Sequence, residues 1–383
     1  MACNDFGTEW VRARLDPVIR DAVAKEGYRL LPDQERTVVM STKGASASGK
    51  STMRPLRRRL AAEMGIRWSD FALISPDIWR RALLDFDSLE SHFRYAGTFT
   101  GQELAIVDHK LDGYMARKGE RGVMSHLLID RFRFDSFAPE SDENRRLLAR
   151  LGRPSLIHYL FMITPPHQTV ERAWRRGLET GRFKAVDDLL AHNVEAYAGM
   201  RDFFFARALH PTLAVHYEFL DNDVPQGSVP LTAAFGWNGD LNILDVTCML
   251  NLDRYRKINV NAAGPTEVYP EPATMTAERN LDFLLECARR MPSVNFVEPD
   301  TARIYLRIER GRLAWADPDG AVFVSKDSDT GVAVRAVAPD AFRSNAPRPP
   351  VPCQYLQPER FHTLGRWAAK RPEGLRPNTV LSR

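Results

Sequence analysis

The stretch GASASGKST, at residues 44–52, constrains the fold of this chain more than any other part of the sequence. It matches the pattern G-x-x-x-x-G-K-[ST], in which glycines let the backbone curl around an anion while successive N–H groups point at it. The residues just before it, 38–40, are apolar and suit a buried strand, and apolar residues recur at helical spacing from Met53 to Met64. A strand, a loop and a helix in this order predict a phosphate-binding loop.

The positions of this loop have expected roles. We expect the loop to hold the phosphates of a nucleoside triphosphate, with Lys50 as a mobile cation and the Ser51 hydroxyl as a ligand of Mg²⁺. Pro55 should remove a hydrogen bond from the following helix and bend it at its start. The alternative is a solvent-exposed loop whose lysine is merely hydrated. The expected nucleotide-binding residues are Gly44, Ala45, Ser46, Ala47, Ser48, Gly49, Lys50, Ser51 and Thr52.

The composition is that of a globular protein with balanced charge. Among 383 residues, 53 are basic and 49 acidic, and this net charge of +4 does not by itself indicate a nucleic-acid-binding protein. No apolar run is long enough to span a membrane, and the start, MACNDFGTEW, lacks the pattern of a secretory signal peptide. Four cysteines without metal-ligand spacing indicate reduced thiols. We therefore expect a cytoplasmic protein with no membrane partner, which a specialised secretion system could deliver into a host cell.

Apolar runs alternate with helical stretches as far as residue 220. This alternation predicts an α/β fold, a parallel sheet with helices on both faces and with its chemistry at the carboxyl ends of the strands. The expected strands cover 36–43, 71–77, 123–130, 155–163 and 213–220, and the expected helices cover 8–30 (interrupted at Pro17), 101–119, 139–151, 166–180 and 186–208.

The polar stretch 221–230, which contains Gly and Pro, is the best candidate for a domain boundary. We expect an N-terminal helical extension (1–35), a P-loop kinase domain (36–222) and a small mixed α+β region of unknown role (223–383). Within the last region, 301–325 predicts short antiparallel strands with a turn at DPDG (317–320), and 346–352 predicts an extended connector.

Several charged residues fit the transfer of a phosphoryl group. Asp77 ends the expected second strand, where a carboxylate can orient a sugar hydroxyl and accept its proton. Arg172 and Arg176 are four residues apart on an expected lid helix, with Arg182 beyond it, and could stabilise charge on the transferred group. Asp130 ends the strand LLID and could hold Mg²⁺ or a substrate hydroxyl.

Each of these residues also has a purely structural interpretation. Asp77 could cap the helix that follows it, because Asp is a good N-cap residue. The lid arginines could simply make a helix more soluble, and Asp130 could belong to an ordinary turn. The basic stretch RPLRRRL (54–60) is interpreted as a solvated helix face.

The motifs GASASGKST, SPD, GQELAIVDHKLDGYMARKG, LLID and RAWRRG…GRF, in this order between residues 36 and 220, resemble the zeta-toxin family of P-loop kinases. That resemblance implies phosphorylation, dependent on ATP and Mg²⁺, of a sugar hydroxyl on a nucleotide metabolite, typically UDP-N-acetylglucosamine. Asp130 stands where the simple toxins usually have Glu, and the chain adds an N-terminal helix and a long C-terminal region. These departures are more similar to the AvrRxo-type bacterial type III effectors.

The similarity to these effectors implies a kinase that phosphorylates the 3′-hydroxyl of the adenosine ribose of NAD, and a cognate antitoxin or chaperone that blocks toxicity. Two other classes stay open, a polynucleotide 5′-hydroxyl kinase and a nucleotide-dependent binding module without transfer activity. A nucleic-acid substrate is disfavoured because little sign of a basic channel with stacking aromatic residues is present. The expected substrate contacts are Arg94, Thr98, Thr100, Asp130 and Arg131.

Overall fold

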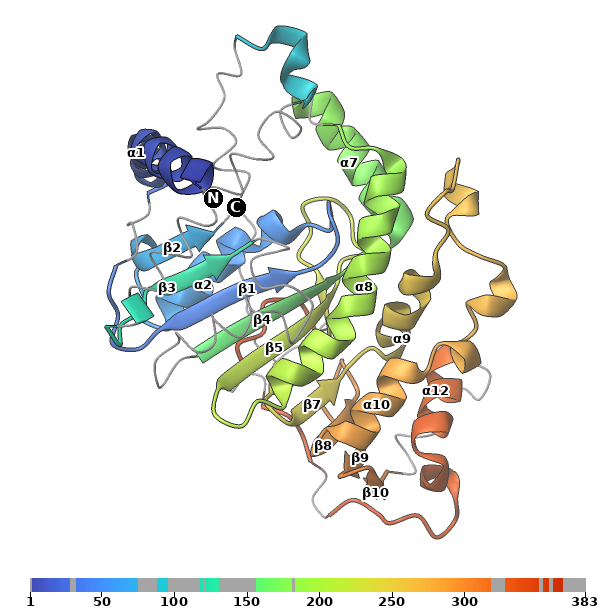
Figure 1. Ribbon diagram of the computed structural model, residues 1–383. Helices are drawn as coiled ribbons and strands as arrows, with labels where there is room; N and C mark the ends of the chain where they lie inside the picture. Colours follow the sequence, from blue (N-terminus) through green and yellow to red (C-terminus); the bar gives the residue numbers. More distant parts are fainter. Residues whose placement is uncertain are drawn as a thin grey trace.

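The computed structural model describes residues 2–27, 32–74, 88–95, 118–119, 121–130, 156–180, 183–317, 328–350, 354–357 and 361–367. Within these ranges, ten strands form one sheet in the order β10-β9-β8-β7-β6-β5-β4-β1-β3-β2 (Figure 1). The strands are β1 (Val38–Lys43), β2 (Phe71–Ile74), β3 (His126–Ile129), β4 (Leu156–Ile163), β5 (Ala214–Asp221), β6 (Leu231–Trp237), β7 (Asp240–Ile243), β8 (Ser293–Val297), β9 (Ile304–Glu309) and β10 (Arg312–Ala316).

The half of the sheet from β2 to β5 is parallel throughout, so the segments that follow these strands leave from one edge. Helices cover both faces, and the α/β fold class expected from the sequence is confirmed. The helices are α1 (Ala2–Lys25), α2 (Arg54–Glu63), α7 (Pro166–Thr180), α8 (Val186–Ala208), α9 (Val246–Arg254), α10 (Asp282–Arg290) and α12 (Asp329–Val337).

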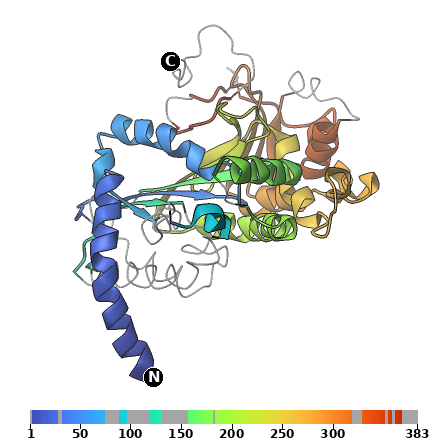
Figure 2. The same cartoon turned by 90° about the horizontal axis from the view of Figure 1, so that it is seen from above.

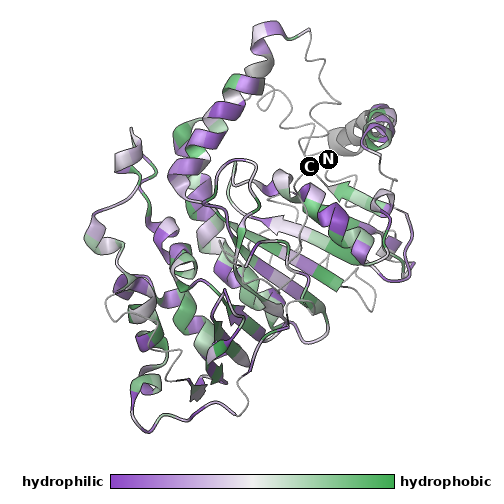
Figure 3. Ribbon diagram, turned by 180° about the vertical axis from the view of Figure 1, so that it is seen from behind, coloured by the Kyte–Doolittle hydropathy of each residue, from purple (hydrophilic) through white to green (hydrophobic). Residues whose placement is uncertain are grey.

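Strand alternation distributes the apolar residues between two layers of core. Val38 and Met40 of β1 face the buried cluster that contains side chains of α1 and α2, whereas Val39 faces the cluster beneath α8, α9 and α10. Figure 1 shows α8 lying along β4 and β5, and in Figure 3, seen from behind, the strands are largely hydrophobic while α2 carries hydrophilic residues on its outer side. The phosphate-binding loop therefore leaves a strand that is buried on both faces.

The helices expected at 166–180 and 186–208 are confirmed as α7 and α8. The interruption expected at Pro17 was wrong, because α1 continues through this residue. Figure 2 shows that the N-terminal part of α1 extends away from the sheet, while Leu15 and Ile19 nearer its end are buried. The expected helix at 139–151 lies outside the described residues, as does the one at 101–119 except for its last two positions.

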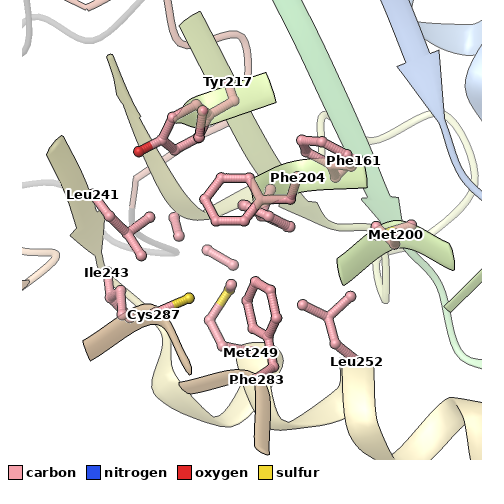
Figure 4. Close-up of a cluster of buried hydrophobic side chains, with 14 of the residues drawn as sticks. Phe161, Met200, Phe204, Tyr217, Leu241, Ile243, Met249, Leu252, Phe283 and Cys287 are labelled. Atoms are coloured by element: carbon pink, nitrogen blue, oxygen red, sulfur yellow. The ribbon is translucent and has the colours of Figure 1, made fainter. Parts of the chain in front are cut away.

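The C-terminal strands continue the same sheet. β6 pairs antiparallel with β5 across the segment in which the boundary at residue 222 was expected, and β7 to β10 extend the sheet further. Side chains from both sides of residue 222 share one core, for example Phe204 and Phe283, whose rings lie 5.8 Å apart (Figure 4). The division into domains stays a prediction.

The antiparallel strands expected within 301–325 are present as β9 and β10. Their turn is at Arg310 and Gly311, both with positive φ (49° and 78°), and the turn expected at 317–320 lies, except for Asp317, outside the described residues. A two-residue turn with positive φ at both positions matches the twist of a hairpin, which explains why the chain reverses there. No helix among the described residues is long and apolar enough to span a lipid bilayer.

Candidate nucleotide site

The GASASGKST stretch forms a loop between β1 and the 3₁₀ turn η1 (Lys50–Met53), which leads into α2. Its backbone needs the glycines. A Cβ atom on Gly44 would lie 2.7 Å from Ser48 Oγ and 2.9 Å from Met162 Cβ, and one on Gly49 would lie 2.6 Å from Asn222 Nδ2. Gly49 also has φ of 91°, a conformation that a residue with a side chain rarely adopts.

The loss of a helix hydrogen bond expected at Pro55 was wrong. Pro55 falls in the first turn of α2, where its missing N–H costs nothing because no partner is available in that turn. The 3₁₀ turn η1 joins the loop to this helix.

Lys50 folds back over the loop. Its Nζ donates to the carbonyl oxygens of Gly44 (3.0 Å) and Ala45 (2.6 Å), so the ammonium group lies inside the curve of the backbone. A long flexible cation in this position can exchange carbonyl oxygens for the oxygens of a phosphate group. The loop and its lysine therefore fit a polyphosphate chain.

Two buried polar residues hold the backbone of the loop in place. The Ser48 carbonyl oxygen accepts hydrogen bonds from Thr164 Oγ1 (3.1 Å) and from Asn222 Nδ2 (2.8 Å). Thr164 follows β4 directly and Asn222 follows β5, so both stand at the carboxyl edge of the sheet. Neither residue was predicted from the sequence, although a polar residue directly after a buried parallel strand is a signal for such a site.

A cavity of about 490 Å³ opens beside the loop, a size typical of small-molecule sites. It lies between the loop and the start of α2 on one side, α7 on a second and the β5–β6 connection on a third. Its lining includes Gly49, Ser51, Thr52, Arg172, Arg175, Arg176 and Glu179, together with Asn222 and residues 225–230. A ligand with phosphates on the loop could place the rest of its structure here.

Arg172 and Arg176 both line this cavity, and their role as lid arginines stays a prediction. Arg172 is also a structural anchor, since its Nη2 donates to the carbonyl oxygens of Asn222 (2.8 Å) and Val224 (3.3 Å). Arg182, the third arginine of the expected lid, lies outside the described residues.

Asp130 follows β3 at the same edge and is held by two arginines of α2. Its oxygens accept from Arg54 Nε (2.8 Å) and from Arg57 Nη1 (3.0 Å), and its side chain is only 4% exposed. The solvated helix face expected for 54–60 was wrong for Arg57, which is fully buried. Burial lowers the pKa of Arg57 to about 10, while the Asp130 charge opposes this.

This arrangement is that of a buried ion pair, in which a carboxylate between two guanidinium groups gains little from an additional cation. The metal and substrate roles of Asp130 stay predictions. Ser51, by contrast, is exposed at the start of η1, so its hydroxyl is accessible to an ion.

A second basic pair lies near the loop and was missed from the sequence. Lys184 Nζ contacts His192 Nδ1 on α8. Burial lowers the pKa of His192, and the positive charges of Lys184 and Lys50 lower it further, so the imidazole is neutral and its Nδ1 accepts from Lys184. Lys184 therefore adds a positive charge near His192, where Glu195 and Asp188 place negative charges.

The structure does not describe the side chains of the other predicted site residues. Asp77, Thr98, Thr100 and Arg131 lie outside the described residues. Arg94 falls in the 3₁₀ segment η3 (Glu90–Tyr95), and the position of its side chain is not described. Their roles stay predictions. The parallel pairing of β2 with β3 shows that β2 ends, at Ile74, on the same edge as the phosphate-binding loop.

No protein-family model matches this chain, and no curated protein matches it. Among solved structures, the native AvrRxo1-ORF1:ORF2 complex is similar with a TM-score of 0.41 and 12% identity, over 86% of this chain and 84% of that chain. The same complex with ATP has a TM-score of 0.38 and 12% identity, over 88% and 85%. The PezAT chromosomal toxin–antitoxin system of Streptococcus pneumoniae has a TM-score of 0.35 and 12% identity, over 54% and 78%. These are the two groups that the motifs resemble, and likeness at this level says nothing about the activity of this chain.

Proposed function

We propose that this protein is a kinase that transfers the γ-phosphoryl group of ATP to a sugar hydroxyl of a nucleotide metabolite. The observation that carries the proposal is the loop at 44–52, whose backbone curve holds the Lys50 ammonium and opens onto a cavity of about 490 Å³. The glycine positions are too crowded for a side chain, which is expected where backbone must approach a ligand closely.

The chain's own residues supply binding, orientation and charge. The loop N–H groups and the start of the helical segment are suited to bind the phosphates, and Lys50 would move from the carbonyl oxygens of Gly44 and Ala45 to the transferred group. Arg176 lines the cavity and would add positive charge beside the phosphates. Transfer of a phosphoryl group depends mainly on such positioning and electrostatic stabilisation.

The exposed Ser51 hydroxyl would hold a magnesium ion, which neutralises charge on the phosphates when it is bound. Asp77 is the proposed residue that orients the acceptor hydroxyl and takes its proton. Arg182 and the contacts proposed at Arg94, Thr98, Thr100 and Arg131 complete the site.

The proposed acceptor is the 3′-hydroxyl of the adenosine ribose of NAD, with UDP-N-acetylglucosamine as the second candidate. Both proposals come from the motif resemblance, as does the proposal of a bacterial toxin or effector with a cognate antitoxin or chaperone. The polynucleotide 5′-hydroxyl kinase is the third candidate.

The test is to incubate the protein with ATP and Mg²⁺ and, in separate samples, with NAD, UDP-N-acetylglucosamine and an oligonucleotide with a free 5′-hydroxyl. Mass spectrometry would identify a product heavier by one phosphoryl group. We expect Lys50→Ala to reduce transfer by at least about 10²-fold, because the cation that stabilises the transferred group is removed.

Lys25→Ala is the matched control, since this lysine is exposed on α1 and forms an ion pair with Asp21 of the same helix. It should keep full activity. Full activity in a folded Lys50→Ala variant would contradict the proposed function, and so would ATP binding without transfer to any of the three acceptors.

A further inference from the structure

A C-terminal segment crosses the sheet beside the nucleotide cavity. Residues 361–367, called the C-terminal strap below, lie on the face that α2 also covers, and Leu364 joins the buried cluster of that face (Figure 2). The rings at its two ends, Phe361 and Trp367, pack against Phe235 of β6, each with a centroid distance of 4.7 Å. The strap is thus seated on β6 at both of its ends.

A buried carboxylate holds the middle of the strap. Glu218 of β5 is fully buried, and its oxygens accept from the backbone N–H groups of Leu364 (2.7 Å) and Gly365 (2.9 Å) and from Thr232 Oγ1 (2.7 Å). Burial raises the pKa of Glu218 to about 7, against the lowering effect of these three hydrogen bonds. A buried carboxylate without donors is costly, so Glu218 and the strap stabilise one another.

A neutral imidazole adds a further contact. His158 of β4 is buried, and its Nε2 donates to the carbonyl oxygen of His362 at 2.9 Å. Burial lowers the pKa of His158 to about 3, so the ring is uncharged at neutral pH and remains a donor.

The strap is joined directly to the wall of the nucleotide cavity. Arg366 N donates to the carbonyl oxygen of Pro230 (2.9 Å), and Arg366 O accepts from Thr232 N (2.7 Å). Pro230 is the last residue of the stretch 225–230 that lines the cavity. The strap therefore fixes the point at which this wall enters β6.

The other end of the wall is fixed by the site itself. Asn222 bonds the Ser48 carbonyl of the phosphate-binding loop, and Arg172 bonds the carbonyl oxygens of Asn222 and Val224. Between these two anchors lies a turn in which Ser228 N donates to Pro225 O (3.0 Å). The wall thus has one anchor beside the nucleotide and one in the strap, far away in sequence.

We propose that the C-terminal strap, held by Glu218, positions the 225–230 wall of the nucleotide cavity and so sets the affinity for ATP, with Glu218 and Gly365 as positioning residues. This inference rests on the proposed function, because it assigns the cavity to the nucleotide. Among the residues proposed to bind the acceptor, Asp130 is the one whose side chain the structure describes, and it is held by Arg54 and Arg57 of α2. We therefore expect the effect to fall on ATP and to change the affinity for the acceptor little.

The decisive variant is Gly365→Ala, which attacks the strap from its own side. A Cβ there would lie 2.6 Å from Leu220 Cδ2 and 2.9 Å from Thr232 N, so the strap must move off the sheet. We expect the dissociation constant of Gly365→Ala for the non-hydrolysable analogue AMP-PNP with Mg²⁺ to rise by roughly tenfold. In kinetic assays, its KM for ATP should rise while its KM for the acceptor stays constant. Glu218→Gln should shift binding in the same direction because an amide N–H₂ would face N–H donors.

Two matched controls separate positioning from general destabilisation. Gly264→Ala places a Cβ with no atom within 4 Å, and Asp253→Asn changes another buried carboxylate, which accepts from Phe283 N on the far side of the core. Both should keep the affinity of the unchanged protein, with folding checked by circular dichroism.

The outcomes distinguish this inference from the proposed function. If the unchanged protein binds AMP-PNP while folded Gly365→Ala or Glu218→Gln binds it equally well, the inference is wrong and the proposed function stands. If Asp253→Asn weakens binding as much as Glu218→Gln does, the effect is general and the inference is also wrong. If the unchanged protein binds no nucleotide, the proposed function fails and the inference fails with it.

Discussion

Asp130 shows how the surroundings of one residue can change its interpretation. A carboxylate at the end of a parallel strand, beside a phosphate-binding loop, suggests a metal ligand. Here its two oxygens face Arg54 and Arg57, and the second of these arginines is fully buried. Taking such a cation out of water is expensive, and the Asp130 charge offsets much of that cost. The pair ties α2, and with it the end of the phosphate-binding loop, to β3.

Stability measurements can test this structural role. Asp130→Asn should lower the free energy of unfolding by roughly 3–5 kcal/mol, because the buried Arg57 would stay charged while the carboxylate that neutralises it is removed. Adding Arg57→Met, which removes that charge and keeps an apolar chain of similar length, should recover part of the loss. Urea unfolding in the absence of nucleotide is the measurement. If Asp130→Asn is as stable as the unchanged protein, the structural role is wrong, and Asp130 is again a candidate to bind metal or substrate.

At the scale of elements, the unit of function is the strand, loop and helix from β1 to α2. β1 lies between β3 and β4 and is buried on both faces, so the loop that follows it starts from a rigid point. The loop is then fixed by Thr164 and Asn222, which follow β4 and β5. Preorganised N–H groups bind phosphate without having to be ordered first, which favours affinity.

The crowding at Gly44 gives a prediction about this unit. Gly44→Ala should weaken AMP-PNP binding by at least about tenfold, because its Cβ would meet both Ser48 Oγ and Met162 Cβ and distort the loop. Ala47→Gly is the matched change in the same loop. Ala47 has φ of 60°, which suits glycine better than alanine, so this variant should bind as well as the unchanged protein. Equal, undiminished binding by both variants would mean that the loop conformation is not needed for phosphate binding.

At the scale of the whole molecule, the C-terminal third completes the sheet and core of the N-terminal part. β6 covers the edge of β5, and α9 and α10 bury aromatic residues of α8, among them Phe205 and Phe204, the second of which is labelled in Figure 4. Phe205 and Phe283, from either side of residue 222, have ring centroids 5.8 Å apart. An N-terminal part on its own would expose both an unpaired strand edge and a large apolar face.

A chain of residues 1–222 should therefore aggregate or fail to fold, whereas a chain of residues 1–367, which keeps the strap, should fold and bind AMP-PNP. Size-exclusion chromatography and circular dichroism would compare the two. A soluble, monomeric chain of residues 1–222 that binds nucleotide would show that 36–222 is an independent domain, and the argument from the shared sheet would be wrong.

The sequence by itself determined the features that depend on neighbours along the chain. The GASASGKST loop, the strand before it and the helix after it follow from a local motif and local periodicity. The five parallel strands and the long helices α7 and α8 were predicted for the same reason, because each has a continuous apolar pattern of its own period. The hairpin turn at Arg310 and Gly311 was not predicted, although a glycine between two strands is a local signal for such a turn.

Only the tertiary structure decided which polar groups meet, because these contacts join residues that are distant in the chain. Arg57 and Asp130 are 73 residues apart, Asn222 and Ser48 are 174 apart, and Leu364 and Glu218 are 146 apart. A charged residue in a sequence carries no sign of whether water or a distant strand will surround it. Burial of Arg57 and Glu218 arises when the sheet assembles and removes water from between its layers, and that step sets the charges, the pKa values and the partners of the site.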